Sequence, residues 1–228
     1  MIRALSILVV VAHPDDEVLG CGGYLAAVSD AHPGHDAPAV RVLILADGET
    51  SRDRDPAVEA RYQMTERALD SLGPIVAEFA GLPDQRLDER SLLDLNRIIE
   101  SAVIRHRPTL VLTHHIGDLN NDHTLVARAT QTACRPVAGS TVRALMAFEV
   151  PSSTEWGFDR TGIGFRPDTF VPINVDRKLA AMACYAPEMR PHPHPRSAEA
   201  IRALATWRGA QSGLPSAEAF STVWRRVD

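Results

Sequence analysis

The sequence predicts an α/β fold: a mostly parallel sheet with helices on both faces and a metal site at the C-terminal ends of the strands. Two observations carry this prediction. Short, β-branched apolar segments alternate with longer segments whose apolar residues recur at helical spacing. The first apolar segment, from Leu5 to Ala12, runs directly into a histidine and three acids. Because ligands of open α/β sheets bind at that end of the strands, we expect the functional site there.

The composition favours one soluble domain over residues 1–228. The chain has 24 Lys and Arg against 29 Asp and Glu and no basic run, so no nucleic-acid partner is expected. The first apolar segment is too short to span a bilayer, and acids follow it at once. We therefore expect no integral membrane segment, no secretion signal and a cytoplasmic location. Three widely spaced cysteines fit neither a disulfide framework nor a C-x-x-C metal site.

The motif His13-Pro14-Asp15-Asp16-Glu17 follows the first strand. His13 offers an imidazole nitrogen and Asp16 a carboxylate oxygen, a mixed donor set that suits zinc. Asp15 lies between these two in sequence, so its carboxylate can remain free and take a proton from bound water. The plainer alternative is an acidic turn that caps the next helix. That alternative explains neither the histidine nor the second aspartate, and the two roles can coexist.

Glycines shortly after the motif raise a nucleotide-binding alternative. Gly20, Gly22 and Gly23 lack the spacing of a dinucleotide fingerprint, and the preceding acids would repel a pyrophosphate. The metal interpretation is therefore favoured.

Up to residue 107 the pattern reads βαβαβα. The expected elements are a helix at Val18–Ser29, a strand at Val40–Ala46, a helix from Pro56 to about Leu72, a strand at Ile75–Ala80 and a helix from Leu92 to Ile104. Arg61, in the second of these helices, is either a surface charge or a donor to a polar substrate. Asp84, in the polar loop after the strand at Ile75–Ala80, is placed with the expected substrate contacts. His32 and His35 are interpreted as solvated loop residues.

A fourth strand, Thr109–Thr113, ends in a polar run from His114 to His123. If this strand lies beside the first, its loop meets the acidic motif, and His123 supplies a third ligand while a coordination position stays open. A lone histidine at a helix start needs no special role, but a second polar cluster at a matching strand end favours the ligand interpretation. His114 and His115 are left out of the ligand set, because one of them is expected to point into the core and bond to backbone.

In the C-terminal third the expected elements are a helix at Thr124–Cys134, a strand at Arg143–Val150, an edge strand or hairpin arm at Phe170–Val175, and helices at Asp176–Tyr185 and from Ser197 to about Ala210. Trp156 lies in a hydroxyl-rich loop and suits stacking on a sugar ring, with a partly buried surface tryptophan as an equal alternative. Lys178 is expected to be solvated. Trp207 is expected on the core face of the last helix.

With both clusters in hand, the chain resembles the PIG-L/LmbE-like family of zinc-dependent N-acetylglucosaminyl deacetylases. The segment from Ala12 to Glu17 looks like the first family motif, and Asp118 to His123 looks like the D-x-N-x-D-H form of the second. Pro195-Arg196-Ser197 and Glu218-Ala219-Phe220 are similar to later family segments.

This resemblance implies zinc held by His13, Asp16 and His123. It implies Asp15 as the general base and a Rossmann-like sheet that carries these residues. It also places Arg61 where some members bind substrate.

The second motif departs from several family members at Asn120, where they have a histidine thought to stabilise the tetrahedral intermediate. Asparagine can donate a hydrogen bond but carries no positive charge. Either Asn120 performs a weaker version of this role, or His192 or His194 reaches the site from the proline-rich loop 187–195. We favour His194, because it adjoins the matching segment Pro195-Arg196-Ser197.

The predicted function is a metal-dependent amidase that removes the N-acetyl group from an N-acetylglucosamine-type amino sugar conjugate, so the expected partner is a small molecule. The expected cofactor is Zn²⁺, although two nitrogens and one carboxylate also accept Fe²⁺ or Co²⁺. The alternative is a non-catalytic, metal-dependent sugar-binding module. The sequence leaves open the group joined to the amino sugar and whether the chain forms a homo-oligomer.

Overall fold

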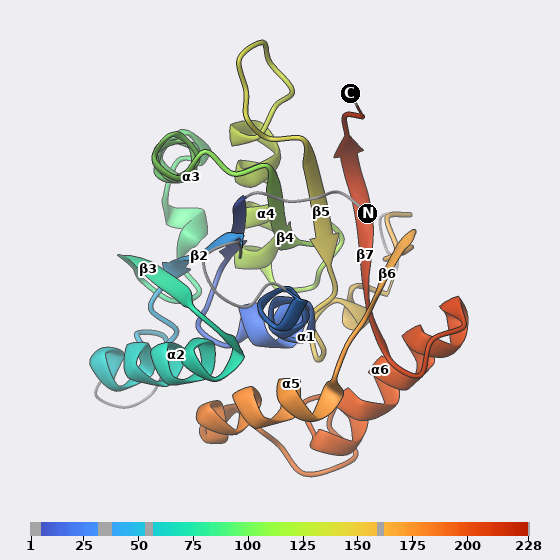
Figure 1. The fold of residues 1–228 in the computed structure, drawn as a ribbon. Helices are drawn as coiled ribbons and strands as arrows, with labels where there is room; N and C mark the ends of the chain where they lie inside the picture. Colours follow the sequence, from blue (N-terminus) through green and yellow to red (C-terminus); the bar gives the residue numbers. More distant parts are fainter. Residues whose placement is uncertain (1–5, 32–37, 53–56, 159–161, 228) are drawn as a thin grey trace.

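The computed structural model describes residues 6–31, 38–52, 57–158 and 162–227. In this part of the chain a seven-stranded sheet runs through the molecule in the order β3-β2-β1-β4-β5-β7-β6 (Figure 1). The strands are β1 (Ser6–Val11), β2 (Ala39–Ala46), β3 (Ile75–Leu82), β4 (Leu110–His114), β5 (Ala144–Phe148), β6 (Thr169–Pro172) and β7 (Ala217–Arg225). Neighbours from β3 to β5 pair in parallel, whereas β7 pairs antiparallel with both β5 and β6. The predicted mostly parallel sheet is confirmed.

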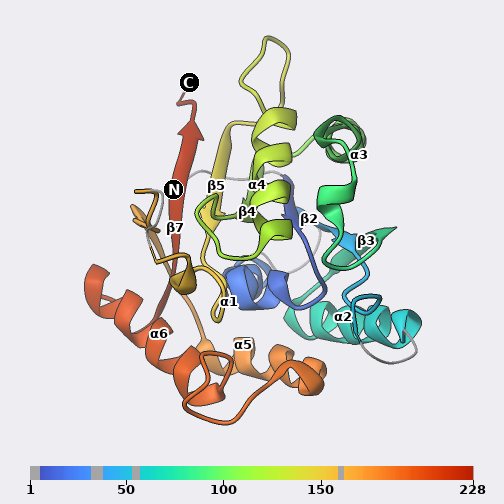
Figure 2. The ribbon, with the colours of Figure 1, turned by 180° about the vertical axis from the view of Figure 1, so that it is seen from behind.

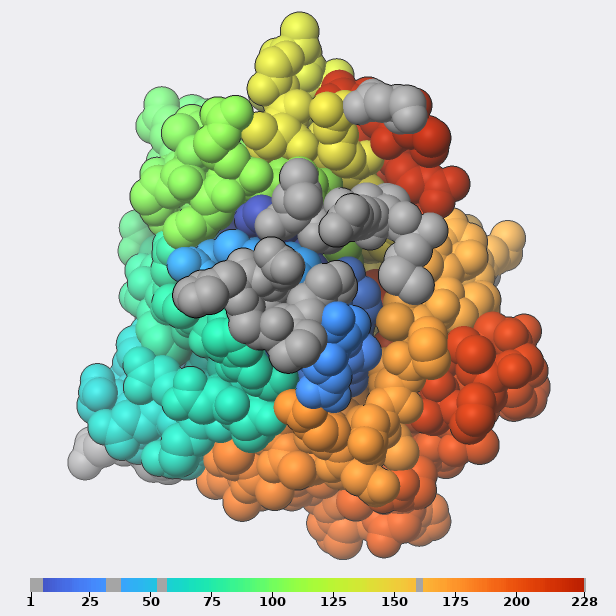
Figure 3. All heavy atoms as spheres, viewed as in Figure 1, coloured from blue at the N-terminus to red at the C-terminus, as the bar shows by residue number. Residues whose placement is uncertain are grey.

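Helices cover both faces of the sheet, as the sequence predicts. Two of them pack together on one face, and the other four lie on the opposite face (Figures 1 and 2). The first pair is α3 (Leu92–His106) and α4 (Asn121–Ala133); the second group is α1 (Asp16–Ala31), α2 (Val58–Leu72), α5 (Val175–Met182) and α6 (Ala198–Ser212). On the surface, α2 adjoins the C-terminal helices along the lower edge of Figure 3. Short 3₁₀ turns lie at Leu87–Glu89, Glu155–Gly157 and Ala183–Glu188.

The central strand β1 is apolar on both sides because it separates two cores. Ile7, Val9 and Val11 pack into the core under α1 and α2, and the alternate residues pack into the core under α3 and α4. Successive side chains of a strand point to opposite faces, so a strand buried on both faces reads as a continuous apolar run. Polar chemistry therefore begins only where the strand ends, at His13.

The site position follows from the strand order. From β1 the chain moves to β2 and β3 on one side, then returns to β4 and β5 on the other side of β1. Connections that leave two adjacent strands in opposite directions open a crevice at their C-terminal ends. Here those ends are the loops that carry the two polar motifs, so the expectation that the first and fourth strands are neighbours is confirmed.

In the C-terminal third, two predictions are wrong and one strand, the antiparallel β7, was not predicted. Lys178 is buried, with 5% of its surface exposed, because its ammonium pairs with Glu218 on β7 at 2.6 Å. Trp207 is 60% exposed and does not belong to the core face of α6, whose buried residues are Ile201, Ala205 and Gly209.

The other expected helices and strands are present with shifted ends, and the helix expected to reach Tyr185 ends at Met182 and continues as a 3₁₀ turn. The three cysteines are free, with Cys21 and Cys134 buried. Pro56, His32 and His35 lie outside the described residues. In the part of the chain that the structure describes, every helix is too short or too polar to cross a lipid bilayer.

Candidate metal centre and active site

Three side chains meet at the crevice between β1 and β4. His13 follows β1, Asp16 begins α1, and His123 lies in the first turn of α4. His13 Nδ1 is 3.3 Å from His123 Nε2 and 3.4 Å from Asp16 Oδ2, and the last two atoms are 3.3 Å apart. All three residues are buried. Their ligand atoms form a nearly equilateral triangle.

This triangle fits a tetrahedral zinc ion. Zinc bonds of about 2.0–2.1 Å to nitrogen and oxygen place adjacent tetrahedral ligands roughly 3.3–3.4 Å apart. Asp16 Oδ1 is buried and has no hydrogen-bond partner among the described residues. Two imidazole nitrogens at 3.3 Å also require a proton or a cation between them. The residues present therefore fit a metal with three protein ligands, the arrangement that catalytic zinc sites use.

Asp118 lies behind His123. Its Oδ1 is 3.3 Å from His123 Nδ1, and the hydroxyls of Ser153 and Thr154 donate to the same carboxylate, the latter at 2.6 Å. Burial alone would raise the pKa of Asp118, but His123 and the two hydroxyls lower it to about 2. A carboxylate beside Nδ1 favours the tautomer that presents Nε2 to a metal.

The triangle favours positive charge. Burial would lower the pKa of His123, yet Asp16 and Asp118 raise it to about 9. Burial would likewise lower the pKa of His13, which Asp122, Asp16 and Asp84 raise to about 10. The carboxylates around the two rings therefore stabilise a cation at this point.

His114 supports the site without entering the triangle. Its ring stacks on that of His123 with centroids 4.0 Å apart, and its Nε2 accepts a hydrogen bond from the Ala12 N–H at 2.9 Å. Burial and the neighbouring His123 lower its pKa to about 3, so the ring is neutral. The expectation that one histidine of the pair lies in the core and bonds to backbone is confirmed.

Asp15 adopts a backbone conformation that non-glycine residues seldom take, with φ at 112°. Its N–H donates to Glu17 Oε2 at 3.1 Å, and the Tyr185 hydroxyl donates to Glu17 Oε1 at 2.6 Å. Burial raises the pKa of Glu17 to about 8. A buried carboxyl group and a tyrosine thus hold the strained turn that carries Asp15.

Two guanidinium groups lie close to the same oxygen of the Asp15 carboxylate. Arg196 Nη1 lies 2.9 Å from Asp15 Oδ2, and Arg61 Nη2 lies 3.5 Å from the same oxygen. Burial raises the pKa of Asp15 to about 6, while Arg196 and Arg61 act to lower it. Glu188 also pairs with both arginines, at 2.8 Å from Arg61 Nη1 and 3.4 Å from Arg196 Nη1.

The expected substrate contact Arg61 is almost wholly buried. Besides Asp15 and Glu188, it donates to the Pro14 carbonyl at 2.8 Å, so its described contacts support the motif itself. Arg196 and Glu188 were not among the predicted site residues. The match of Pro195-Arg196-Ser197 to a late family segment was a usable signal for Arg196, whereas no sequence pattern marked Glu188.

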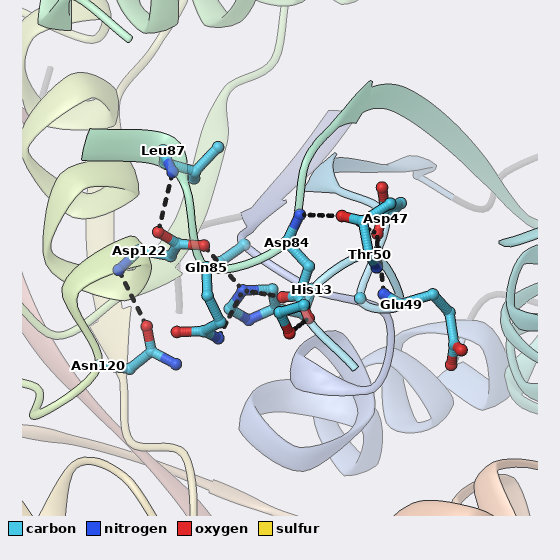
Figure 4. A network of polar contacts seen from close by, with 12 residues as sticks. His13, Asp47, Glu49, Thr50, Asp84, Gln85, Leu87, Asn120 and Asp122 are labelled. Atoms are coloured by element: carbon cyan, nitrogen blue, oxygen red, sulfur yellow. Dashed lines mark hydrogen bonds and ion pairs between the residues drawn. The ribbon is translucent and has the colours of Figure 1, made fainter. Parts of the chain in front are cut away.

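Asn120 and His194 each have one polar atom committed to the backbone. Asn120 Oδ1 caps α4 by accepting from the Asp122 N–H at 2.9 Å, and His194 Nδ1 accepts from the Arg196 N–H at 3.1 Å. The half-buried Trp156 meets His194 edge to face, with centroids 6.0 Å apart. Asp84 is buried, and its Oδ1 lies 3.2 Å from His13 Nε2 (Figure 4).

Comparison with known proteins decides the family. The model of the family described as PIG-L: GlcNAc-PI de-N-acetylase matches residues 8–134, more than half of the chain. The chain belongs to the PIG-L family. One relative is the uncharacterized deacetylase YaiS of Escherichia coli strain K12. It is 30% identical to this chain over 191 residues, which cover 78% of this chain and 88% of YaiS.

Solved structures share the fold of this PIG-L family member over nearly its whole length. The 4-carboxy-2-hydroxymuconate hydratase GalB of Pseudomonas putida KT2440 is 27% identical, with 98% of both chains covered and a TM-score of 0.76. N,N'-diacetylchitobiose deacetylase of Pyrococcus horikoshii is 17% identical, with 97% of this chain and 84% of that chain covered and a TM-score of 0.76. Teicoplanin deacetylase Orf2, solved in a zinc-inhibited form, is 17% identical, with coverages of 98% and 99% and a TM-score of 0.73.

Proposed function

We propose that this protein is a zinc-dependent hydrolase that removes the N-acetyl group from an N-acetylglucosamine-type amino sugar conjugate. The observation that carries the proposal is the buried triangle of His13, Asp16 and His123 next to the carboxylate of Asp15. The family and the names of its deacetylase relatives support the reaction. When bound, zinc would polarise the acetyl carbonyl and lower the pKa of a water molecule towards about 7.

Asp15 is the general base in this proposal. Its carboxylate takes a proton from the attacking water and returns it to the leaving amine as the amide C–N bond breaks, so acetate and a free amine form. Arg196 and Arg61 orient the carboxylate and favour its ionised form. Trp156 is proposed to stack on the sugar.

Turnover and metal content test these assignments separately. Zinc-loaded protein should release equal amounts of acetate and amine from N-acetylglucosaminyl conjugates. Asp15→Asn should lower turnover by about two to four orders of magnitude with nearly unchanged zinc content, because losing a general base spares the ligands. His13→Ala and His123→Ala should lose the metal. Loss of zinc from Asp15→Asn would mean that base and ligand are wrongly assigned, and bound zinc without acetate from any conjugate would favour the binding module.

His194 is proposed as the donor to the negative charge that develops on the substrate. Because its Nδ1 accepts from backbone, a neutral His194 carries its proton on Nε2 and can donate from there. One preorganised donor of this kind is worth about a hundredfold in rate, so His194→Ala should lower the maximal rate by that factor with little change in zinc content. His192→Ala is the control on the same loop. Two variants alike and near wild type would leave Asn120, through its amide nitrogen, as the donor.

A second candidate reaction is the addition of water to a carbon–carbon double bond of an unsaturated polycarboxylate. GalB favours it, since that hydratase has a higher identity to this chain than the two deacetylase structures above. A base beside an activated water serves either reaction, because water loses a proton in both as it attacks an electrophilic carbon. Arg196 and Arg52, both beside Glu188, supply cations suited to substrate carboxylates.

Two assays distinguish the candidates. Hydration of a conjugated hydroxymuconate-type substrate removes its ultraviolet absorbance and releases no acetate. Deacetylation releases acetate and leaves such a substrate untouched. Asp15→Asn should lower whichever activity is present by about two to four orders of magnitude, so the two assays identify the reaction and the variant identifies the base.

A further inference from the structure

His13 presents its second ring nitrogen to two carboxylates. Nε2 lies 3.1 Å from Asp122 Oδ2 and 3.2 Å from Asp84 Oδ1, while Nδ1 of the same ring is a corner of the metal triangle (Figure 4). We propose that Asp84 and Asp122 are positioning residues that hold the Nε2–H of His13 and thereby aim Nδ1 at the metal. The inference rests on the metal of the proposed function but not on the identity of the reaction.

Asp122 is fixed by the loop before α3. Its Oδ1 accepts a hydrogen bond from the Leu87 N–H at 3.2 Å, and its own N–H donates to the Asn120 cap. These bonds leave Oδ2 facing His13, where the side chain is almost completely buried. The backbone of two segments therefore determines where this carboxylate points.

Asp84 is fixed by the loop after β2. The Ser51 hydroxyl donates to its Oδ2 at 2.5 Å, and the Asp84 N–H donates to Thr50 Oγ1 at 2.8 Å. Asp47 holds Thr50 in turn, by accepting from its N–H at 2.9 Å. Two segments, after β3 and at the start of α4, thus present a carboxylate to one nitrogen, and the loop after β2 holds the first of these carboxylates in place (Figure 4).

The chemistry of imidazole explains why this convergence matters. A neutral histidine that binds a metal through Nδ1 carries its proton on Nε2, and a carboxylate that accepts this proton fixes the tautomer, restrains the ring and makes the ligand nitrogen more basic. His123 has the mirror arrangement, with Asp118 behind Nδ1 and Nε2 in the triangle. The Gln85 amide, 3.3 Å from His13 Nε2, can also turn its oxygen to the same proton.

Two other roles compete for the same atoms. His13, Asp84 and Asp122 also form a group that could hold a cation of its own. That role would remove the proton from Nε2 and make one ring bridge two cations, whereas the positioning role needs only the ordinary neutral imidazole. The other competitor is the substrate contact that the sequence predicted for Asp84; the burial of its side chain and its bonds to Ser51 and His13 favour the positioning role instead.

Zinc affinity measured by competition with a chelator tests the proposal. Asp84→Asn and Asp122→Asn should each weaken zinc binding, and the double variant should weaken it by about 10–100-fold, the usual effect of removing an outer hydrogen-bond partner of a ligand. The absorption bands of the cobalt(II)-loaded variants should shift as the ligand field changes. With saturating zinc, the KM for substrate should stay near that of wild type. Asp88→Asn is the matched control, because Asp88 is an exposed acid close to Asp84 in the same loop.

Three results would overturn the proposal. One is a double variant whose zinc affinity stays within about threefold of wild type. Another is wild-type protein that binds two zinc ions when the variants bind one, which would establish the second cation site. The last is a raised KM with unchanged zinc affinity in Asp84→Asn, which would restore the substrate contact. If Asp122→Asn fails to fold, Asp84→Asn decides alone. If the protein has no deacetylase activity, the zinc affinities of the variants still test this proposal, because their measurement does not require turnover.

Discussion

Glu188 is the residue on which three arginines of the site meet. Its carboxylate lies 2.7 Å from Arg52, 2.8 Å from Arg61 and 3.4 Å from Arg196. Burial alone would raise the pKa of Glu188, but the arginines hold it below its ordinary value of 4.5. The ionised form is therefore favoured by folding.

The pH dependence of stability should reveal this contact. Folding lowers the pKa of Glu188. The ion pairs of Glu188 with the arginines therefore contribute stability that is fully present above pH 4.5 and is lost as the pH falls through the lower pKa of the folded state. Glu188→Gln should lower the free energy of unfolding at pH 7 by about 3 kcal/mol, because it removes the carboxylate that the buried Arg61 shares with Arg52 and Arg196. The difference from wild type should shrink in acid.

Urea denaturation at a series of pH values measures both effects. Glu89→Gln is the control, because Glu89 pairs with Arg86 on the exposed surface, where ion pairs contribute little. A difference between Glu188→Gln and wild type that is constant from neutral to acid pH would show that charge is not the cause.

At the scale of single residues, the sequence predicted those site residues that lie close together along the chain. His13, Asp15 and Asp16 lie together because a strand end and one turn put them there. Arg196 reaches Asp15 across 181 positions of sequence, so only folding brings the two together. Arg61 was found, but its burial could not be read from its place in an amphipathic helix.

At the scale of elements, a buried ion pair between Glu218 of β7 and Lys178 of α5 binds both elements to the backbone of α1. Glu218 on β7 accepts from the Gly23 and Tyr24 N–H groups at 2.9 and 2.6 Å. Lys178 of α5 donates to the Leu19 carbonyl at 2.7 Å and pairs with Glu218 at 2.6 Å. Gly23 N and Leu19 O lie one helical turn apart, so the pair satisfies a donor and an acceptor of the same turn of α1.

Removing one partner should be costly, and removing both less so. Glu218→Gln leaves a buried ammonium without its counter-ion and should lower the free energy of unfolding by about 3–5 kcal/mol. Adding Lys178→Met should recover part of that loss, since the unpaired charge is then gone. Urea denaturation of the two single variants and the double variant gives the coupling. Strictly additive losses would show that the two side chains do not act as a pair.

The same pair explains two errors of sequence interpretation. Lys178 reads as a surface lysine because its partner follows 40 positions later in sequence. The strand around Glu218 escapes notice because its first residues, Ala217 to Ala219, are small or charged rather than β-branched. In both cases burial depends on packing between elements, which local patterns do not contain.

For the molecule as a whole, the fold class was predictable and the strand order was predictable in part. Alternating apolar strands and amphipathic helices specify a parallel sheet with covered faces. The adjacency of β1 and β4 could be assumed only as a condition for the two motifs to meet. The two motifs set no such condition for the antiparallel pair of β6 and β7. The sequence predicts β6 only as an edge strand or hairpin arm and gives no sign of β7.

The division of the site along the chain has a consequence for how such a scaffold diversifies. The segment 8–134 that matches the family model contains every corner of the metal triangle, whereas Trp156, His194 and Arg196 come later. In the proposed hydrolase, substitutions in the later segment can therefore alter which molecule is held while the residues proposed to activate water stay unchanged. Arg196 is the exception, because it comes from the later segment and lies 2.9 Å from Asp15. In the proposed hydrolase, a substitution of Arg196 should therefore change selectivity and rate together.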